Sequence, residues 1–297
     1  MDDENDLLGV LGVMMAAVLW GTTGVAATFA PEVGAVAIGS AAMGVGGLLQ
    51  AGLAFRTVTR HHMALRVQWH WLLAGAVSVA VYPLAFYASM RLAGVTVGTV
   101  VSLGSAPLAS ALIEILLDGL RVSRRWVVGA ALGLIGMALL SLAEGYDEGM
   151  NDEPTSLMAG VALGLTAGLT YAFYSWVARR MMQRRIPTRA AMGTMFGLGG
   201  LMLMPVLFVT GGSFLDSWQN ASVGLYMAFV PMFVGYLCFG YGLARVQAST
   251  ATTITLLEPV VAAGLAALIV GERLPVQGWI GVGLIFACLL CITLPKR

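Results

Sequence analysis

Apolar residues form ten long runs along the chain, and short polar segments separate these runs. They fall near residues 7–29, 34–55, 70–91, 95–117, 125–143, 156–177, 189–210, 221–243, 248–270 and 276–294. Each run is close to the ~20 residues that an α-helix needs to cross a bilayer. The pattern therefore predicts an all-α integral membrane protein with ten transmembrane helices.

The composition agrees with a chain that lies mostly in lipid. Hydrophobic residues make up 59% of the 297 residues, charged residues only 10%, and the mean hydropathy is +0.86. Soluble domains have roughly 25% charged residues. The net charge of +1 gives no reason to expect nucleic acid binding. Lys296 is the only lysine, which excludes a Walker A phosphate loop and hence an ATP-driven pump within this polypeptide.

The distribution of basic residues predicts the orientation in the membrane. If the N-terminus lies inside, all of the 16 Lys and Arg residues except Arg91 and Arg273 fall in cytoplasmic segments. Cytoplasmic loops are the ones that concentrate Lys and Arg. We therefore expect a multi-pass protein of the bacterial inner membrane with both termini in the cytoplasm and the acidic segment 144–155 outside.

Two halves of the chain resemble each other on either side of that acidic segment. A shift of 152 residues brings Pro107 onto Pro259 and Gly129 onto Gly281. Because each half contains an odd number of spans, five, the second half must be inverted relative to the first, as in secondary transporters. Strips of glycine allow close helix packing, so a monomer or a weak dimer is expected. The predicted boundaries are 1–143 for the first repeat, 144–155 for the external linker and 156–297 for the second repeat.

Span four and span nine each have a hydroxyl-rich first half that reaches a proline near mid-membrane. Bent or broken helices at corresponding places in two repeats are the best sequence pointer to a transport site. In the alternative interpretation these hydroxyls only satisfy the backbone of their own helix. The residues concerned are Ser102, Ser105 and Pro107 in span four, and Thr255, Glu258 and Pro259 in span nine.

Aromatic residues mark the other candidate cavity spans. Trp20, Tyr82 and Tyr171 lie too deep in their runs to belong to an interfacial aromatic belt. Buried Trp and Tyr side chains usually find a polar partner. A cavity lined by such residues would favour substrates with planar or apolar side chains.

Glu258 is the acidic residue that most needs an explanation. A charged side chain at mid-membrane costs at least ~2.5–3.5 kcal/mol on insertion scales. Three functional interpretations of Glu258 are a hydrogen-bond donor to Ser102 or Ser105, a carboxylate for the substrate's ammonium group, and a proton carrier in a coupled cycle. A structural hydrogen bond that holds the bent helix is the fourth interpretation, and the sequence leaves all four open.

Several motifs resemble the EamA-type, ten-span drug/metabolite transporter superfamily. They are "LWGTTG" near the start, the proline of span four, and "LLEPVVAAGLAALIVGERL" followed by "GWIGVGLIFACLL". The resemblance covers nearly the whole chain and implies an inner-membrane exporter of small metabolites. The amino-acid exporters, particularly those for aromatic amino acids, look most similar. The first half departs from the pattern, because Ala106 stands where the second half has Glu258.

The leading hypothesis is a secondary carrier that exports amino acids by alternating access at a midplane cavity between the repeats. It would need a small-molecule substrate and a lipid bilayer as partners, no cofactor and no metal, and proton coupling stays open. The alternatives are a multidrug or other-metabolite exporter of the same fold, a channel, or a membrane-embedded enzyme. An enzyme is disfavoured because no His-Glu-x-x-His motif and no intramembrane histidine is present.

Overall fold

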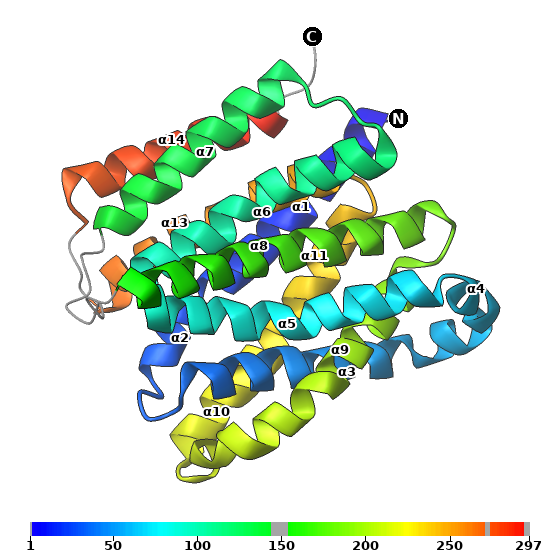
Figure 1. Cartoon of the computed structure of the whole chain (residues 1–297), viewed down its shortest axis with the longest axis horizontal. Helices are drawn as coiled ribbons and strands as arrows, with labels where there is room; N and C mark the ends of the chain where they lie inside the picture. Colours follow the sequence, from blue (N-terminus) through cyan, green and yellow to red (C-terminus); the bar gives the residue numbers. More distant parts are fainter. Residues whose placement is uncertain (1, 144–153, 271–273, 294–297) are drawn as a thin grey trace.

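The computed structural model describes residues 2–143, 154–270 and 274–293, and its regular elements are all helical (Figure 1). The first half contains α1 (Asp2–Gly21), α2 (Thr23–Thr28), α3 (Ala35–Arg60), α4 (His62–Val67), α5 (Trp69–Ala93), α6 (Val95–Asp118) and α7 (Arg124–Ala143). The second half begins with α8 (Pro154–Gln183), α9 (Thr188–Thr210) and the 3-10 helix η1 (Gly211–Leu215). It continues with α10 (Trp218–Met227), the π-helix η2 (Ala228–Val234), α11 (Gly235–Leu243), α12 (Ala248–Ile254), α13 (Leu257–Leu265), the π-helix η3 (Ala266–Val270) and α14 (Val276–Thr293).

These elements make 10 stretches that are long and apolar enough to cross a membrane, so the expected all-α architecture is confirmed. Three of the spans are interrupted: span one between α1 and α2, span eight at η2, and span nine between α12 and α13. The predicted linker 144–155 lies outside the described residues except for its last two positions, and so do Arg273 and Lys296.

The contacts between helices stay the same when each span is replaced by its counterpart in the other repeat. Span two (α3) packs on its counterpart span seven (α9), and span five (α7) packs on span ten (α14). Span three packs on span six (α5 on α8), just as span eight packs on span one (α11 on α1). This reciprocity is what a two-fold relation between two inverted five-helix repeats requires.

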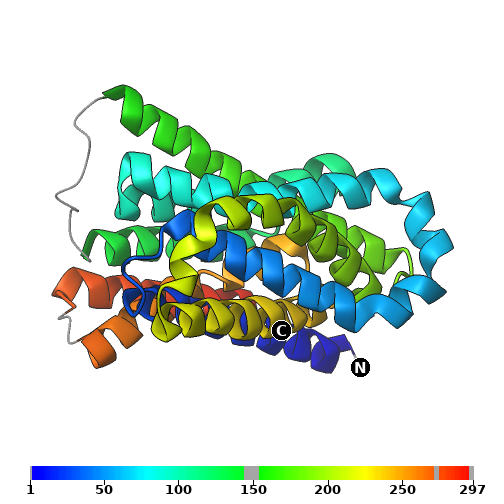
Figure 2. The same cartoon turned by 90° about the horizontal axis from the view of Figure 1, so that it is seen from below.

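The connections place most arginines at one end of the bundle, which we call the basic end. It contains the start of α1, α4, and the connections 119–123, 184–187 and 244–247. Figures 1 and 2 both show the start of α1 and the α4 region at the same end. Among the described arginines only Arg91 belongs to the opposite end. Those at the basic end are Arg56, Arg60, Arg66, Arg121, Arg124, Arg125, Arg179, Arg180, Arg184, Arg185, Arg189 and Arg245.

Glycine lets the central helices approach within backbone contact. On α3, a Cβ at Gly47 would overlap the carbonyl oxygen of Phe196 on α9. The glycine strip Gly160, Gly164 and Gly168 packs α8 against α5 and α6 in the same way. The strip therefore serves packing within the bundle, which is the use that small residues have in membrane helices.

The contact at Gly47 gives a stability prediction with a matched control on the same helix. We expect Gly47→Ala to destabilise the protein by about 1–3 kcal/mol, because a backbone carbonyl cannot move aside like a flexible side chain. Gly52→Ala has open space around its Cβ and should be neutral or slightly stabilising. Thermal unfolding in detergent measures both variants, and equal midpoints would contradict this account of the α3–α9 contact.

Candidate functional site

Six spans surround a cavity near the middle of the bundle. Its cavity volume is about 60 Å³, which holds a few water molecules and is well below the ~300–1,000 Å³ of typical small-molecule sites. Spans one, two, three, six, eight and nine all contribute to its wall. The lining residues are Trp20, Thr23, Gly39, Ala42, Met43, Tyr82, Pro83, Phe86, Tyr87, Tyr171, Met227, Met232, Tyr236 and Glu258.

Glu258 is the one lining residue with an ionisable carboxyl group. Among the described residues, none donates a hydrogen bond to its side chain or forms an ion pair with it. Four tyrosines line the same cavity, namely Tyr82, Tyr87, Tyr171 and Tyr236. The protein thus presents a carboxyl group to the cavity and leaves its hydrogen-bonding capacity unused.

The break in span nine explains how Glu258 reaches this position. Pro259 cannot donate a hydrogen bond to the carbonyl of Thr255 four residues before it. The backbone N–H of Glu258 donates to that carbonyl instead, at 2.9 Å, and Leu256 donates to Thr253 at 3.2 Å. These two tighter turns end α12 and begin α13, whose first turn contains Glu258. A helix N-terminus also favours a negative charge in that turn.

Two of the predicted aromatic residues are fixed by hydrogen bonds behind the cavity wall. Trp20 Nε1 donates to the carbonyl of Pro231 in η2 at 2.9 Å, and Tyr171 OH donates to Thr255 Oγ1 at 3.1 Å. The rings of Trp20 and Tyr171 meet edge to face, with centroids 6.4 Å apart. Both side chains therefore link interrupted spans to their neighbours as well as lining the cavity.

Four further tyrosines lie at or beside the cavity. Tyr174 and Tyr236 bond to each other, whereas Tyr82 and Tyr87 line the cavity. The hydroxyls of Tyr174 and Tyr236 share a hydrogen bond of 2.8 Å. Tyr82 packs against Tyr171 with ring centroids 5.5 Å apart. In the part of the chain that the structure describes, neither Tyr82 nor Tyr87 has a hydrogen-bond partner for its hydroxyl. These two hydroxyls and Glu258 are the polar groups that remain for a ligand.

The structure brings four of the predicted site residues together and separates the others from them. Trp20, Tyr82, Tyr171 and Glu258 line the same cavity, and Thr255 lies behind Tyr171.

The hydroxyls predicted on span four lie elsewhere. Ser105 Oγ donates to the carbonyl of Ser102 at 3.3 Å, and Ser102 Oγ is buried with no hydrogen-bond partner among the described residues. A Cβ at Gly168 on α8 would collide with Ser105, so this face of α6 packs on α8. Neither serine bonds to Glu258. The helix α6 also runs uninterrupted through Pro107, so of the two predicted helix-bend prolines Pro259 is the one at a break.

Sequence reasoning missed a second acidic residue inside the bundle, Glu114 on α6. Its side chain is only 2% exposed, and its carboxylate accepts hydrogen bonds from Ala248 N at 2.7 Å and Ser249 N at 3.3 Å. The signal was present, because Glu114 interrupts an apolar run four residues before Asp118.

The arrangement is suited to binding a cation rather than to chemistry on a bound metal. No group of three or more His, Cys, Asp or Glu side chains occurs within residues 2–143, 154–270 and 274–293. Aromatic faces attract cations such as an ammonium group. A carboxylate beside several such faces can therefore hold an ammonium group, with hydroxyls near it for a second polar group.

Comparison with known proteins agrees with this description. The family model for the EamA-like transporter family matches twice, over residues 7–142 and 158–294. The uncharacterized transporter YwfM of Bacillus subtilis (strain 168) is 30% identical over 97% of this chain and 94% of its own length. The threonine/homoserine exporter RhtA of Escherichia coli (strain K12) is 29% identical over 97% of this chain and 91% of its own length.

A solved crystal structure shares the fold. It superposes with a TM-score of 0.78 and covers 95% of both chains, at 18% sequence identity. Two family matches, one in each half, also coincide with the two five-span repeats.

Proposed function

The chain belongs to the EamA-like transporter family, and from that premise we propose that it exports amino acids by alternating access to the Glu258 cavity. It is a multi-pass membrane transporter and not an enzyme. The proposal depends above all on one observation: a carboxyl group without a protein partner faces an aromatic cavity at mid-span.

An amino acid complements each polar group that the cavity leaves free. Its α-ammonium group pairs with the carboxylate of Glu258 and lies against the face of Trp20 or a tyrosine. Its α-carboxylate accepts hydrogen bonds from the hydroxyls of Tyr82 and Tyr87. The side chain then contacts aromatic and methionine walls, which favour bulky apolar or aromatic amino acids. The similarity to RhtA, named a threonine/homoserine exporter, supports the amino-acid class.

A counterflow assay in proteoliposomes tests this substrate class. We expect saturable exchange of neutral amino acids, tested with phenylalanine, leucine, threonine and homoserine. The N-acetyl derivative of the best substrate should exchange at least ~10-fold more slowly, because it lacks the ammonium group that pairs with Glu258. Liposomes without protein are the control. Equal exchange of the N-acetyl compound, or of apolar dyes, would contradict the proposal and favour a multidrug or other-metabolite exporter; flux without saturation would indicate a channel.

We also propose that the basic end lies in the cytoplasm of a bacterial inner membrane. Positive charge accumulates on that side of membrane proteins, and α1 begins there.

Single cysteines labelled in intact cells test the orientation. In a variant without the native cysteines, a cysteine in place of Arg184 should react with an impermeant maleimide only after the cells are permeabilised. A cysteine in place of Ser213, at the opposite end, should react in intact cells. The reverse pattern would overturn the orientation.

A further inference from the structure

The short connection between α11 and α12 is held from both sides by buried charged groups. At the end of α11, Arg179 donates hydrogen bonds to the carbonyls of Leu243, at 3.0 Å, and Val246. At the start of α12, Glu114 accepts from the backbone N–H groups of Ala248 and Ser249. The guanidinium group of Arg179 thus lies at the negative end of the α11 dipole, and the carboxylate of Glu114 lies at the positive end of the α12 dipole.

A row of hydroxyl contacts extends this attachment along α12. Ser249 Oγ also donates to Glu114 Oε2, and one turn further Thr252 Oγ1 donates to Ser110 Oγ on α6 at 3.1 Å. Another turn further, Thr255 Oγ1 accepts from Tyr171 OH on α8. We call the contacts of Ser249, Thr252 and Thr255 the polar seam. It attaches one face of α12 to α6 and α8 from the basic end to the cavity wall.

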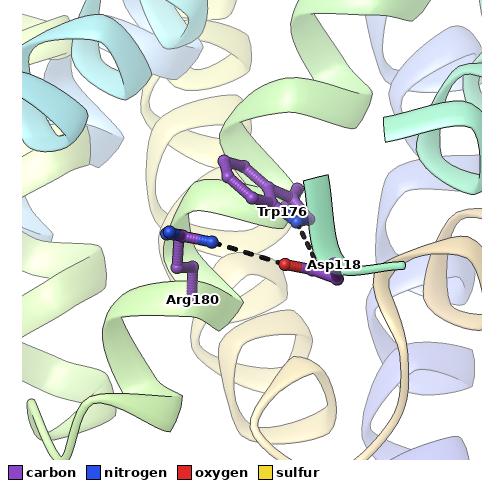
Figure 3. A network of polar contacts seen from close by, with 3 residues as sticks. All are labelled: Asp118, Trp176 and Arg180. Carbon is purple, nitrogen blue, oxygen red and sulfur yellow. Dashed lines mark hydrogen bonds and ion pairs between the residues drawn. The ribbon is translucent and has the colours of Figure 1, made fainter. Parts of the chain in front are cut away.

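The helices α6 and α8, on which α12 lies, are joined to each other and to α5 by polar and aromatic contacts. Asp118, at the end of α6, accepts from Trp176 Nε1 at 2.7 Å and pairs with Arg180 at 3.3 Å (Figure 3). Arg180 also lies over the rings of Trp71 and Trp176, 5.2 and 4.9 Å from their centroids. These groups join α5, α6 and α8 to one another, and α12 packs on α6 and α8.

The polar seam lies between the basic end and Glu258 along span nine. The helix α12 begins at that end, none of its residues lines the cavity, and the break precedes Glu258. The break at Thr255 and Leu256 interrupts the regular hydrogen bonding between α12 and α13. The two short helices are thus separate units of backbone hydrogen bonding, and α12 packs on α1, α7 and α11 as well as on α6 and α8.

We propose that the polar seam is the gate on the basic side and that Glu114 is its positioning residue. In the described conformation Glu114 fixes α12 in the closed position, and separation of the seam opens the cavity towards the basic end. This inference rests on the proposed transport cycle, since a gate is needed only where access alternates. The hydroxyls of α12 thereby have a function other than direct contact with the substrate.

A reversible cross-link across the seam tests the gate. In a variant with Cys238, Cys288 and Cys291 replaced by alanine, Ser110→Cys and Thr252→Cys place two thiols where hydroxyl oxygens lie 3.1 Å apart. We expect the oxidised pair to lose about nine-tenths of counterflow activity and to recover it in reductant. Each single variant should be insensitive to oxidation. Unchanged exchange by the fully cross-linked protein would overturn the proposal, because the contact would then stay closed through the whole cycle.

A second measurement needs no substrate and so distinguishes failure of the gate from failure of the proposed function. A cysteine at Thr255 is labelled with an impermeant maleimide added from the basic side. Glu114→Gln should raise the labelling rate roughly tenfold, since it removes a charged acceptor from two backbone donors. Glu32→Gln, at an exposed acid of the opposite end, is the matched control. Equal labelling rates in the two variants would overturn the role of Glu114 even if no amino acid were exchanged.

Discussion

Within a bilayer every backbone polar group must find a partner in the protein, and in span nine Pro259 removes the regular partner of the Thr255 carbonyl. That carbonyl receives the N–H of Glu258 instead, and the span divides into α12 and α13. The break creates a new helix N-terminus, that of α13, and Glu258 lies in its first turn. Glu114 serves another helix end, since it accepts from the N–H groups at the start of α12, where span nine begins. Both acidic residues inside the bundle thus lie at a helix N-terminus of span nine.

The two acids differ in what surrounds them, and this difference assigns their roles. Glu114 has its oxygens occupied by Ala248 and Ser249, so it has little left for a ligand. Glu258 has no such donors among the described residues and faces the cavity. Burial of a carboxylate is costly unless it is paired and hydrogen-bonded. Under the proposed function, a bound ammonium group supplies that partner, and substrate binding then compensates a cost that the empty site retains.

The sequence predicted the parts that follow from length, charge and chemistry along one chain. The ten spans, the two repeats, and the functional interest of Glu258 with Trp20 and Tyr171 all follow from residues that are unusual in lipid. The interior face of α6 was not predicted, because its polar residues are few and the sequence does not show which neighbour each one faces. Ser102 and Ser105 therefore looked like cavity residues, although neither lines the cavity and Ser105 packs on α8, and Glu114 was overlooked.

The sequence also did not predict which of the two proline-containing spans is interrupted. Pro107 and Pro259 occupy corresponding positions in the two repeats, yet only span nine is interrupted. A proline removes one hydrogen bond in either helix. At the break in span nine, Thr255 Oγ1 accepts from Tyr171 OH on α8, 84 positions away in the chain. Such a contact becomes visible only in the folded chain.

The central claim is that the carboxylate of Glu258 binds the ammonium group of the substrate. Equilibrium binding of the amino acid exchanged best, measured with purified protein in detergent, tests it most directly. Glu258→Gln keeps the shape of the side chain but removes the charge, and it should weaken binding at least ~10-fold while Glu32→Gln binds like the unmodified protein. Unaltered affinity in Glu258→Gln would contradict the claim. Loss of exchange alone would then make Glu258 a proton carrier, and loss of neither would make it a structural residue of the broken helix.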